Sequence, residues 1–125
     1  MVKKICLDTD VCIVFLNNLP LKEKIINLII DSDIFVSSVT VFELLSRKTN
    51  SQKVEDFLWD LNVLYFDFEA AKMASQVQKI QKSKRKIIDA RDLFIAATAM
   101  SNGCDLLTLN SKNYESIQGL NLVGN

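Results

Sequence analysis

The sequence predicts an α/β fold, in which helices flank a central, mostly parallel sheet of four to five strands. Short continuous apolar runs alternate along the chain with segments in which apolar residues recur every three or four positions. This is the pattern of strands buried on both faces alternating with amphipathic helices. The 125 residues, 49% of them hydrophobic, contain no repeat and no Pro/Gly/Ser-rich linker, so we expect a single domain spanning residues 1–125.

Four short apolar runs are the expected strands. They cover residues 5–7, 34–36, 63–66 and 106–109, and a weaker fifth candidate covers 120–123. None of them alternates between apolar and polar residues, which favours a sheet covered on both faces.

Helical periodicity fills the segments between these runs. Apolar residues recur at helical spacing over 21–29, 54–61 and 70–80. The stretch 92–100 is apolar on all sides after its first residue, which indicates a helix packed against the sheet. The small side chains of Ala96, Ala97 and Ala99 would allow its close approach.

The composition excludes several kinds of catalytic site. The chain has no histidine, so it cannot form a Ser-His-Asp triad or a zinc site with imidazole ligands. Glycine occurs only at 103, 119 and 124, so the glycine-rich loops that bind nucleotide phosphates are missing. Fifteen basic and fifteen acidic side chains give a net charge of zero, which neither requires nor forbids a nucleic-acid partner.

The sequence contains no disulfide pattern, signal peptide or membrane span that would indicate secretion or membrane insertion. Cys6, Cys12 and Cys104 are odd in number and lack C-x-x-C spacing, so we expect no disulfide framework and a reducing cytoplasm. Asp8 interrupts the first apolar run, which argues against a signal peptide. The longest apolar run, 93–100, is far shorter than the roughly 20 residues that cross a bilayer, so we expect no membrane association.

Polar side chains follow the expected strands at their carboxyl ends, where parallel sheets collect ligands. They are Asp8, Thr9 and Asp10 after the first strand, Thr40 and Glu43 after the second, Asn110 after the fourth, and Asp92 at the start of the apolar helix. An acid that ends a buried strand is costly unless it is solvated, hydrogen-bonded or paired with a cation.

Helix capping is the structural alternative for these acids. Asp8 or Asp10 could cap the helix that follows the first strand, although one cap explains only one acid. Thr40 and Glu43 have the T-x-x-E spacing of a capping box, and this spacing alone favours a cap.

The acid near the apolar helix has a similar alternative. Asp89 could be the N-cap of this helix and Asp92 its first-turn acid. Three or four acids at one edge of a sheet would nevertheless repel each other unless a divalent cation lay between them. Oxygen ligands favour Mg²⁺ or Mn²⁺, which can activate water and offset charge on a phosphodiester.

Four motifs resemble those of a known family in their order and spacing. They are I-C-L-D-T-D at 5–10, V-F-E-L-L at 41–45, D-L-F-I-A-A-T-A at 92–99 and L-T-L-N at 107–110. Together they resemble the motifs of PIN-domain ribonucleases, especially VapC-type toxins, over essentially the whole chain. The resemblance implies a three-layer PIN-like fold and an Mg²⁺- or Mn²⁺-dependent endoribonuclease in which Asp8, Glu43 and Asp92 bind the metal. It also implies an RNA substrate, a homodimer and a VapB-type antitoxin.

Two positions depart from the pattern of this family. The run 108–114 reads T-L-N-S-K-N-Y, so Asn113 stands where the family commonly carries an acid. An amide can still ligate through its oxygen but lacks the charge that helps to retain a second ion, so we expect one firmly held metal and a weak second one. Asp10 stands where asparagine or serine is frequent, and we expect it to compensate partly for Asn113 at the metal site.

The substrate is expected to contact polar groups around the acids. Five cations lie between residues 79 and 86, and they are either a solvated helix end or a site for phosphates. The expected substrate-binding residues are Thr9, Thr40, Asn110, Lys84, Arg85 and Lys86. Phe57 and Trp59 are expected in the core or at a dimer contact and not as stacking platforms for bases.

Two other functions are kept as alternatives. Asp8 and Asp10 have the D-x-D spacing of haloacid dehalogenase-like phosphatases, as nucleophile and acid/base, but the chain is short and the later motifs are hard to place. A receiver-like or catalytically weakened PIN module that binds RNA or a partner is the non-enzymatic alternative. A receiver would need an acceptor aspartate after the third strand, where Asp67 instead has the position of a helix cap.

Overall fold

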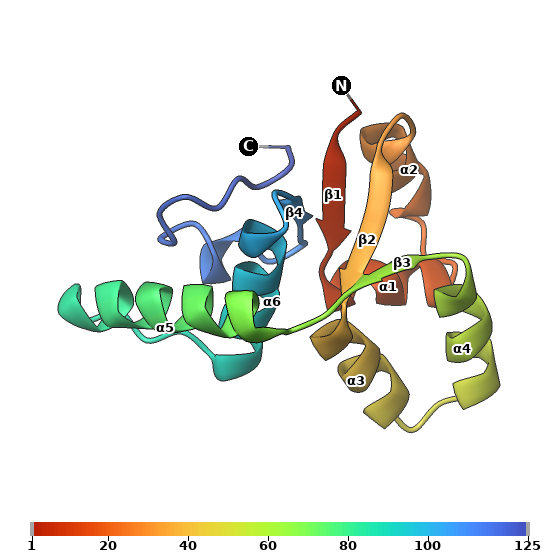
Figure 1. The fold of residues 1–125 in the computed structure, drawn as a ribbon. Coiled ribbons are helices and arrows are strands. Elements are labelled where there is room, and N and C mark those ends of the chain that lie inside the picture. The colour runs from red at the N-terminus through yellow and green to blue at the C-terminus, as the bar shows by residue number, and fades with distance from the viewer. Residues whose placement is uncertain (1, 125) are drawn as a thin grey trace.

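The computed structural model describes residues 2–124, which form four strands, six α-helices and one 3-10 turn (Figure 1). In chain order these are β1 (Lys4–Leu7), α1 (Thr9–Leu16), α2 (Lys22–Ile29), β2 (Asp33–Ser37), α3 (Ser38–Ser46), α4 (Ser51–Trp59), β3 (Asn62–Leu64), α5 (Phe68–Ser83), α6 (Ala90–Ser101), β4 (Asp105–Leu107) and η1 (Ser111–Asn113). The alternation of strands and helices confirms the predicted α/β class.

The strands form one parallel sheet in the order β3-β2-β1-β4. Ile5 of β1 is opposite Ile34 of β2 on one side and Asp105 of β4 on the other. The weaker fifth strand at 120–123 was a wrong prediction, because only Leu122 forms an isolated bridge, to Leu106. The chain leaves the sheet there after one pairing.

Helices cover both faces of this sheet. Cys6 of β1 packs into a core with α5 and α6, whereas its neighbours Ile5 and Leu7 pack into a second core with α1 to α4. Figure 1 shows α5 and α6 on one side of the strands and α1, α2 and α4 on the other. The continuous apolar runs of the sequence are explained by this burial from both sides.

Helix α6 is the most buried helix of the first core. Ala96, Ala97 and Ala99 are fully buried, and α6 packs mainly on α5 and also against β2 and β4. Alanine at these positions lets the helix approach its neighbours closely, as the sequence predicted.

The aromatic side chains of α4 differ in their burial. Phe57 is partly buried and stacks on Phe15, with ring centroids 6.2 Å apart. Trp59 is 87% exposed, which excludes the core and leaves the dimer contact as the remaining part of that prediction. No helix among residues 2–124 has the length and apolar character that crossing a bilayer requires.

The strand order places a crevice beside β1. Strands β2 and β3 lie on one side of β1, and the chain then crosses to the other side to form β4. In parallel sheets, ligands bind at the carboxyl ends of the strands where the order switches in this way. Here the switch lies between β1 and β4, whose carboxyl ends lead into Asp8 and Thr108.

We predict that Ala96→Leu lowers the free energy of unfolding by about 1 to 3 kcal/mol, because a fully packed helix contact has no room for three more carbon atoms. Urea denaturation measures the change. Ala71→Leu, on the exposed face of α5, is the matched control and should change stability by no more than about 0.5 kcal/mol. Equal effects of the two substitutions would contradict the described packing of α6.

Candidate functional site

A pocket of about 260 Å³ opens at the carboxyl ends of β1 and β4. Its lining residues are Asp8, Thr9, Asp10, Ile13, Glu43, Asp92, Asn110 and Asn113. All five residues predicted to bind metal therefore lie around one pocket, together with two of the residues predicted to contact the substrate. They come from α1, α3, α6, η1 and the strand ends, which are far apart in sequence.

Asp8 is the most buried acid of this pocket, with 6% of its surface exposed. Its Oδ1 accepts a hydrogen bond from the Thr9 backbone N–H at 2.8 Å and so caps α1. Its Oδ2 accepts from the hydroxyls of Thr108 at 2.8 Å and Tyr114 at 3.0 Å. The Asp8 carboxylate therefore both caps α1 and lines the pocket, so its role as a cap does not exclude the predicted functional role.

Asp10 lies in the first turn of α1 and is not its cap. Its Oδ2 accepts from the Leu109 backbone N–H at 3.2 Å and lies 3.4 Å from the Thr108 hydroxyl. Its Oδ1 is buried and has no hydrogen-bond partner among residues 2–124. A buried carboxylate oxygen in this state is costly unless a donor or a cation reaches it.

The capping box predicted from Thr40 and Glu43 is not formed. Helix α3 starts three residues earlier than that motif requires, and its N-cap is Ser37, whose hydroxyl oxygen accepts from the Thr40 backbone N–H at 3.0 Å. The sequence was misleading here because serine caps helices as well as threonine does. Glu43 therefore lies further along the helix and is free to line the pocket.

Glu43 is held from two sides. Its Oε1 accepts from the Thr9 hydroxyl at 2.7 Å, and its Oε2 lies 3.7 Å from Nη1 of Arg91. Thr40 lies beneath this contact, with its hydroxyl oxygen 3.1 Å from that of Thr9. Because Thr40 is fully buried, the prediction that it contacts the substrate was wrong, and it supports Thr9 instead.

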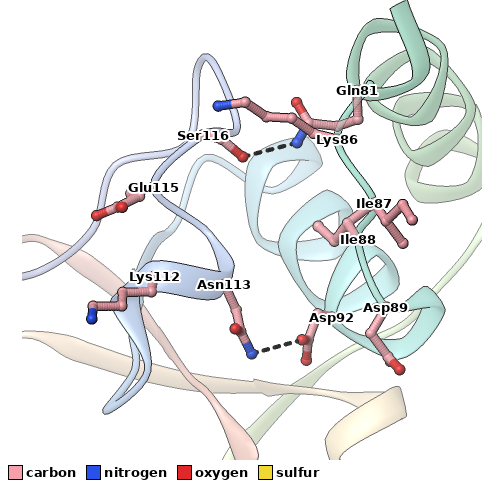
Figure 2. Close-up of a pocket in the computed structure, with 10 residues that line it drawn as sticks. All are labelled: Gln81, Lys86, Ile87, Ile88, Asp89, Asp92, Lys112, Asn113, Glu115 and Ser116. Atoms are coloured by element: carbon pink, nitrogen blue, oxygen red, sulfur yellow. Dashed lines mark hydrogen bonds between the residues drawn. The ribbon is translucent and has the colours of Figure 1, made fainter. Parts of the chain in front are cut away.

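Asp92 enters the pocket from the first turn of α6. Asp89 caps this helix by accepting from the Arg91 backbone N–H at 2.9 Å, which is the capping alternative that the sequence left open. The Asp92 Oδ1 lies 3.1 Å from the Tyr114 hydroxyl oxygen and shares its single proton with Asp8, and the Asp92 Oδ2 accepts from the Asn113 amide at 3.2 Å. Figure 2 shows Asn113 pointing from η1 toward Asp92. The Asn113 amide therefore donates a hydrogen bond to Asp92. An ionised aspartate or glutamate at position 113 has no proton to donate and could not form this bond.

Burial and repulsion by neighbouring charges disfavour the charged forms of the three aspartates of the pocket. Burial raises the pKa of Asp8, and the charge of Glu43 raises it further, against the hydrogen bonds from Thr108, Thr9 and Tyr114. Burial, followed by the charge of Asp8, raises the pKa of Asp10 to about 6. Burial also raises the pKa of Asp92, with added repulsion from Asp8. The pocket is therefore a place where positive charge would be stabilised.

The donor set fits a hard divalent cation. Among residues 2–124, no three acidic or cysteine side chains are close enough to form a complete cage around an ion. Mg²⁺ needs no such cage, because it keeps several waters and binds through one or two carboxylates. The oxygen ligands around the pocket and the unpartnered Oδ1 of Asp10 suit a cation of this kind.

A second cavity of about 520 Å³ adjoins the first and shares Asp92 and Asn113 with it (Figure 2). Its other lining residues are Gln81, Lys86, Ile87, Ile88, Asp89, Lys112, Glu115 and Ser116. Of the three cations predicted to bind substrate, Lys86 lines this cavity, whereas Lys84 and Arg85 line neither cavity. Lys112 of η1 was not predicted and lines it as well.

Thr108, Tyr114 and Arg91 also contact the site acids and were not predicted from the sequence. Thr108 directly follows β4, but the apolar run placed the expected strand over 106–109, so Thr108 was counted inside the strand. Arg91 directly precedes Asp92 in the sequence. This position alone does not show that the Arg91 side chain faces Glu43. The Tyr114 hydroxyl reaches Asp8 across a separation of 106 residues, which only the packing of the fold reveals.

Comparison with known proteins identifies relatives of this chain. Residues 5–119 match the model of the PIN domain family. The tRNA(fMet)-specific endonuclease VapC of Shigella flexneri is 28% identical over 124 residues, which cover 94% of each chain. The protein of the same name from Salmonella typhimurium is 32% identical over 128 residues, covering 95% of this chain and 96% of the relative.

Solved structures show the same arrangement of strands and helices. The structure of VapBC2 from Rickettsia felis, bound to a DNA fragment from their promoter, matches with a TM-score of 0.83 and 25% identity over 95% of this chain and 96% of that one. DNA-bound VapBC from Salmonella typhimurium matches with a TM-score of 0.83 and 30% identity over 98% and 97%. The similarity therefore extends over nearly the whole fold.

We predict that Asp10→Asn stabilises the metal-free protein at neutral pH. Because the pKa of Asp10 is raised from 3.8 to about 6, the folded state binds more protons than the unfolded state between these values. The contribution of Asp10 to stability is therefore fully present below about pH 4 and is lost as the pH rises through about 6. Removing the carboxylate should raise the free energy of unfolding at about pH 8 by about 1 kcal/mol, after a discount for partial exposure.

Urea denaturation in EDTA at about pH 4.5 and about pH 8 tests this prediction. Asp31→Asn, an exposed aspartate near the opposite ends of the strands, is the control and should have the same small effect at both values. A stabilisation by Asp10→Asn that did not grow with pH would show that the Asp10 carboxylate is not disfavoured in the folded state.

Proposed function

The chain belongs to the PIN domain family, and we propose that it is a VapC-type toxin, an endoribonuclease that hydrolyses RNA phosphodiester bonds with Mg²⁺ or Mn²⁺. The observation that carries this proposal is the pocket in which Asp8, Glu43 and Asp92 meet at the carboxyl end of β1. The similar proteins from Shigella and Salmonella are endonucleases by name, and they match nearly the whole chain. The haloacid dehalogenase alternative is not pursued, because the chain belongs to a different family.

The acids of the pocket are the proposed metal ligands. Asp8, Glu43 and Asp92 would hold the ion, one or two of them directly and the rest through its bound waters, with Asp10 and Asn113 beside them. When bound, Mg²⁺ or Mn²⁺ supplies an activated water and offsets charge on the scissile phosphate. We expect one firmly held ion, because Asn113 offers an uncharged oxygen and its amide nitrogen already donates to Asp92.

Neighbouring hydroxyls fix the orientation of these acids. Thr108 donates to Asp8, and Thr9 donates to Glu43, so each carboxylate keeps a defined rotamer before substrate arrives. Asn110 lies at the pocket and has an exposed side chain, which suits a contact with the sugar-phosphate backbone. We therefore keep Thr9 and Asn110 as substrate-side residues and place Thr40 behind them.

The second cavity provides a path for the RNA strand beyond the acids. Lys86 and Lys112 line it, and it shares Asp92 and Asn113 with the first pocket. A strand with its scissile phosphate at the acids would place neighbouring phosphates within reach of these lysines. We assign phosphate binding to Lys86 and Lys112 in preference to Lys84 and Arg85, which line neither cavity.

We further propose a VapB-type antitoxin as the partner, a homodimer as the assembly, and the cytoplasm as the location. The antitoxin follows from the similar VapBC structures, and exposed Phe42 and Trp59 give α3 and α4 an apolar surface for a partner chain. The cytoplasm suits the free thiols of Cys6, Cys12 and Cys104. We treat residues 1–125 as one domain, since side chains from both ends of the chain share a core.

A catalytically weakened PIN module that binds RNA or a partner is the second candidate. It is favoured by Asn113, which replaces the charge of an acid with an amide that donates to Asp92. RNA binding without turnover would distinguish this module from the enzyme.

We predict that Asp8→Asn and Asp92→Asn each lower the rate of RNA cleavage by at least about 100-fold, because each removes a charged ligand of the ion. Initiator tRNA is the first substrate to test, since the similar endonucleases are named for it. Cleavage is measured on gels with Mn²⁺ and with EDTA, and circular dichroism checks folding. Asp31→Asn is the control and should retain full activity. Cleavage that continued in EDTA or in both site variants would contradict the proposal.

We predict that Lys86→Ala and Lys112→Ala each raise KM by about 3- to 10-fold with little change in kcat, because they bind phosphates away from the reacting one. The dependence of binding on salt should also weaken. Lys24→Ala, an exposed lysine on α2, is the matched control for loss of one positive charge. A KM equal to that of the control would show that the RNA strand does not contact Lys86 or Lys112.

A further inference from the structure

Tyr114 is a buried tyrosine whose hydroxyl lies between two acids of the pocket. The residue is 1% exposed, and its hydroxyl oxygen is 3.0 Å from Oδ2 of Asp8 and 3.1 Å from Oδ1 of Asp92. No other side chain among residues 2–124 forms hydrogen bonds to both acids. The hydroxyl therefore joins the end of β1 to the first turn of α6 at the site itself.

The ring of Tyr114 cannot easily move. It belongs to the core that includes Cys6 of β1, Leu106 of β4 and Ala96 of α6, and it is among the largest fully buried side chains. Its backbone N–H also donates to the Ser111 carbonyl at 2.9 Å, which closes the turn η1. The hydroxyl is thus fixed by packing, and its position sets where the two carboxylates can lie.

The hydroxyl leaves both acids able to bind a cation. Each carboxylate oxygen has two lone-pair directions, and the single proton of the phenol is shared between one oxygen of Asp8 and one oxygen of Asp92. Thr108 takes the second direction on the same oxygen of Asp8, whose other oxygen accepts from the Thr9 backbone N–H, and the other oxygen of Asp92 accepts from Asn113. Within residues 2–124 a lone-pair direction therefore stays free on Oδ1 of Asp8 and on each oxygen of Asp92, and these can bind a cation.

We propose that Tyr114 is a positioning residue of the metal site, whose hydroxyl ties Asp8 to Asp92 and holds them at the separation that the ion uses. This inference rests on the proposed function, because it concerns the same ion. Groups behind the ligands orient them, and removing such a group typically costs about 10- to 100-fold in metal affinity or activity. The hydroxyl of Tyr114 is such a group for two ligands at once.

Tyr114→Phe tests this role, because it removes the hydroxyl and keeps the buried ring. We expect the affinity for Mn²⁺, measured by electron paramagnetic resonance, to fall by about 10-fold or more. Cleavage of RNA should then need a correspondingly higher concentration of Mn²⁺. The chain offers a matched control in Tyr65→Phe, the same deletion at a tyrosine that is 69% exposed, which should bind Mn²⁺ as the unmodified protein does.

The outcomes separate this inference from the proposed function. Mn²⁺ binding that is lost in Asp8→Asn but unchanged in Tyr114→Phe would leave the proposed function standing and overturn the role of Tyr114. A lower melting temperature of Tyr114→Phe with unchanged Mn²⁺ affinity would show a merely structural role and also overturn it. An unmodified protein that binds no Mn²⁺ would overturn the proposed function and this inference with it.

A second measurement keeps the test open if Tyr114→Phe does not fold. The chain has two tyrosines, so 3-fluorotyrosine incorporated into the Tyr65→Phe protein labels position 114 alone. We expect its fluorine resonance to shift on titration with Mg²⁺, with the midpoint of metal binding. A resonance that does not respond at saturating Mg²⁺ would overturn the proposal, because the hydroxyl would then not contact ligands of the ion.

Discussion

The whole site depends on how a buried negative charge at the end of β1 is compensated. Asp8 is 6% exposed and follows an apolar strand, so water cannot solvate it fully. Three groups from different elements donate to it: the Thr9 backbone N–H at the start of α1, the Thr108 hydroxyl after β4 and the Tyr114 hydroxyl after η1. Because the Thr108 and Tyr114 donors follow β4 in the chain, they reach Asp8 only when β4 lies beside β1, so the site geometry depends on the sheet order.

The sequence was sufficient to predict the strands, most of the helices and the acids that line the pocket. The four paired strands match the predicted apolar runs because burial on both faces requires continuous apolar residues. The segment 120–123 has the same composition as a strand but pairs only at Leu122, which local sequence does not reveal. Helix α3 shows a similar limit, because Ser37 and Thr40 are both good caps and only the structure selects Ser37.

The contacts between the site residues were beyond sequence reasoning. The acids could be placed at strand ends, since the carboxyl ends of parallel strands meet at one edge. The hydrogen-bond partners of these acids could not be predicted. The bond from Tyr114 to Asp8, for example, spans 106 residues and depends on the packing of the tyrosine ring in the core. The proposed phosphate contacts show the same limit. The run of cations at 79–86 can be seen in the sequence, but only the structure shows that Lys86 lines the cavity and that Lys84 and Arg85 do not.

The double role of Asp8 limits how this protein can lose its activity in evolution. The carboxylate also begins α1, so a change to alanine would remove a helix cap worth about 1 kcal/mol together with the site. Asparagine and serine cap helices about as well as aspartate. Asparagine or serine at position 8 would thus remove the charged ligand and keep the helix cap. A related protein with either residue at this position is expected to be a folded pseudoenzyme.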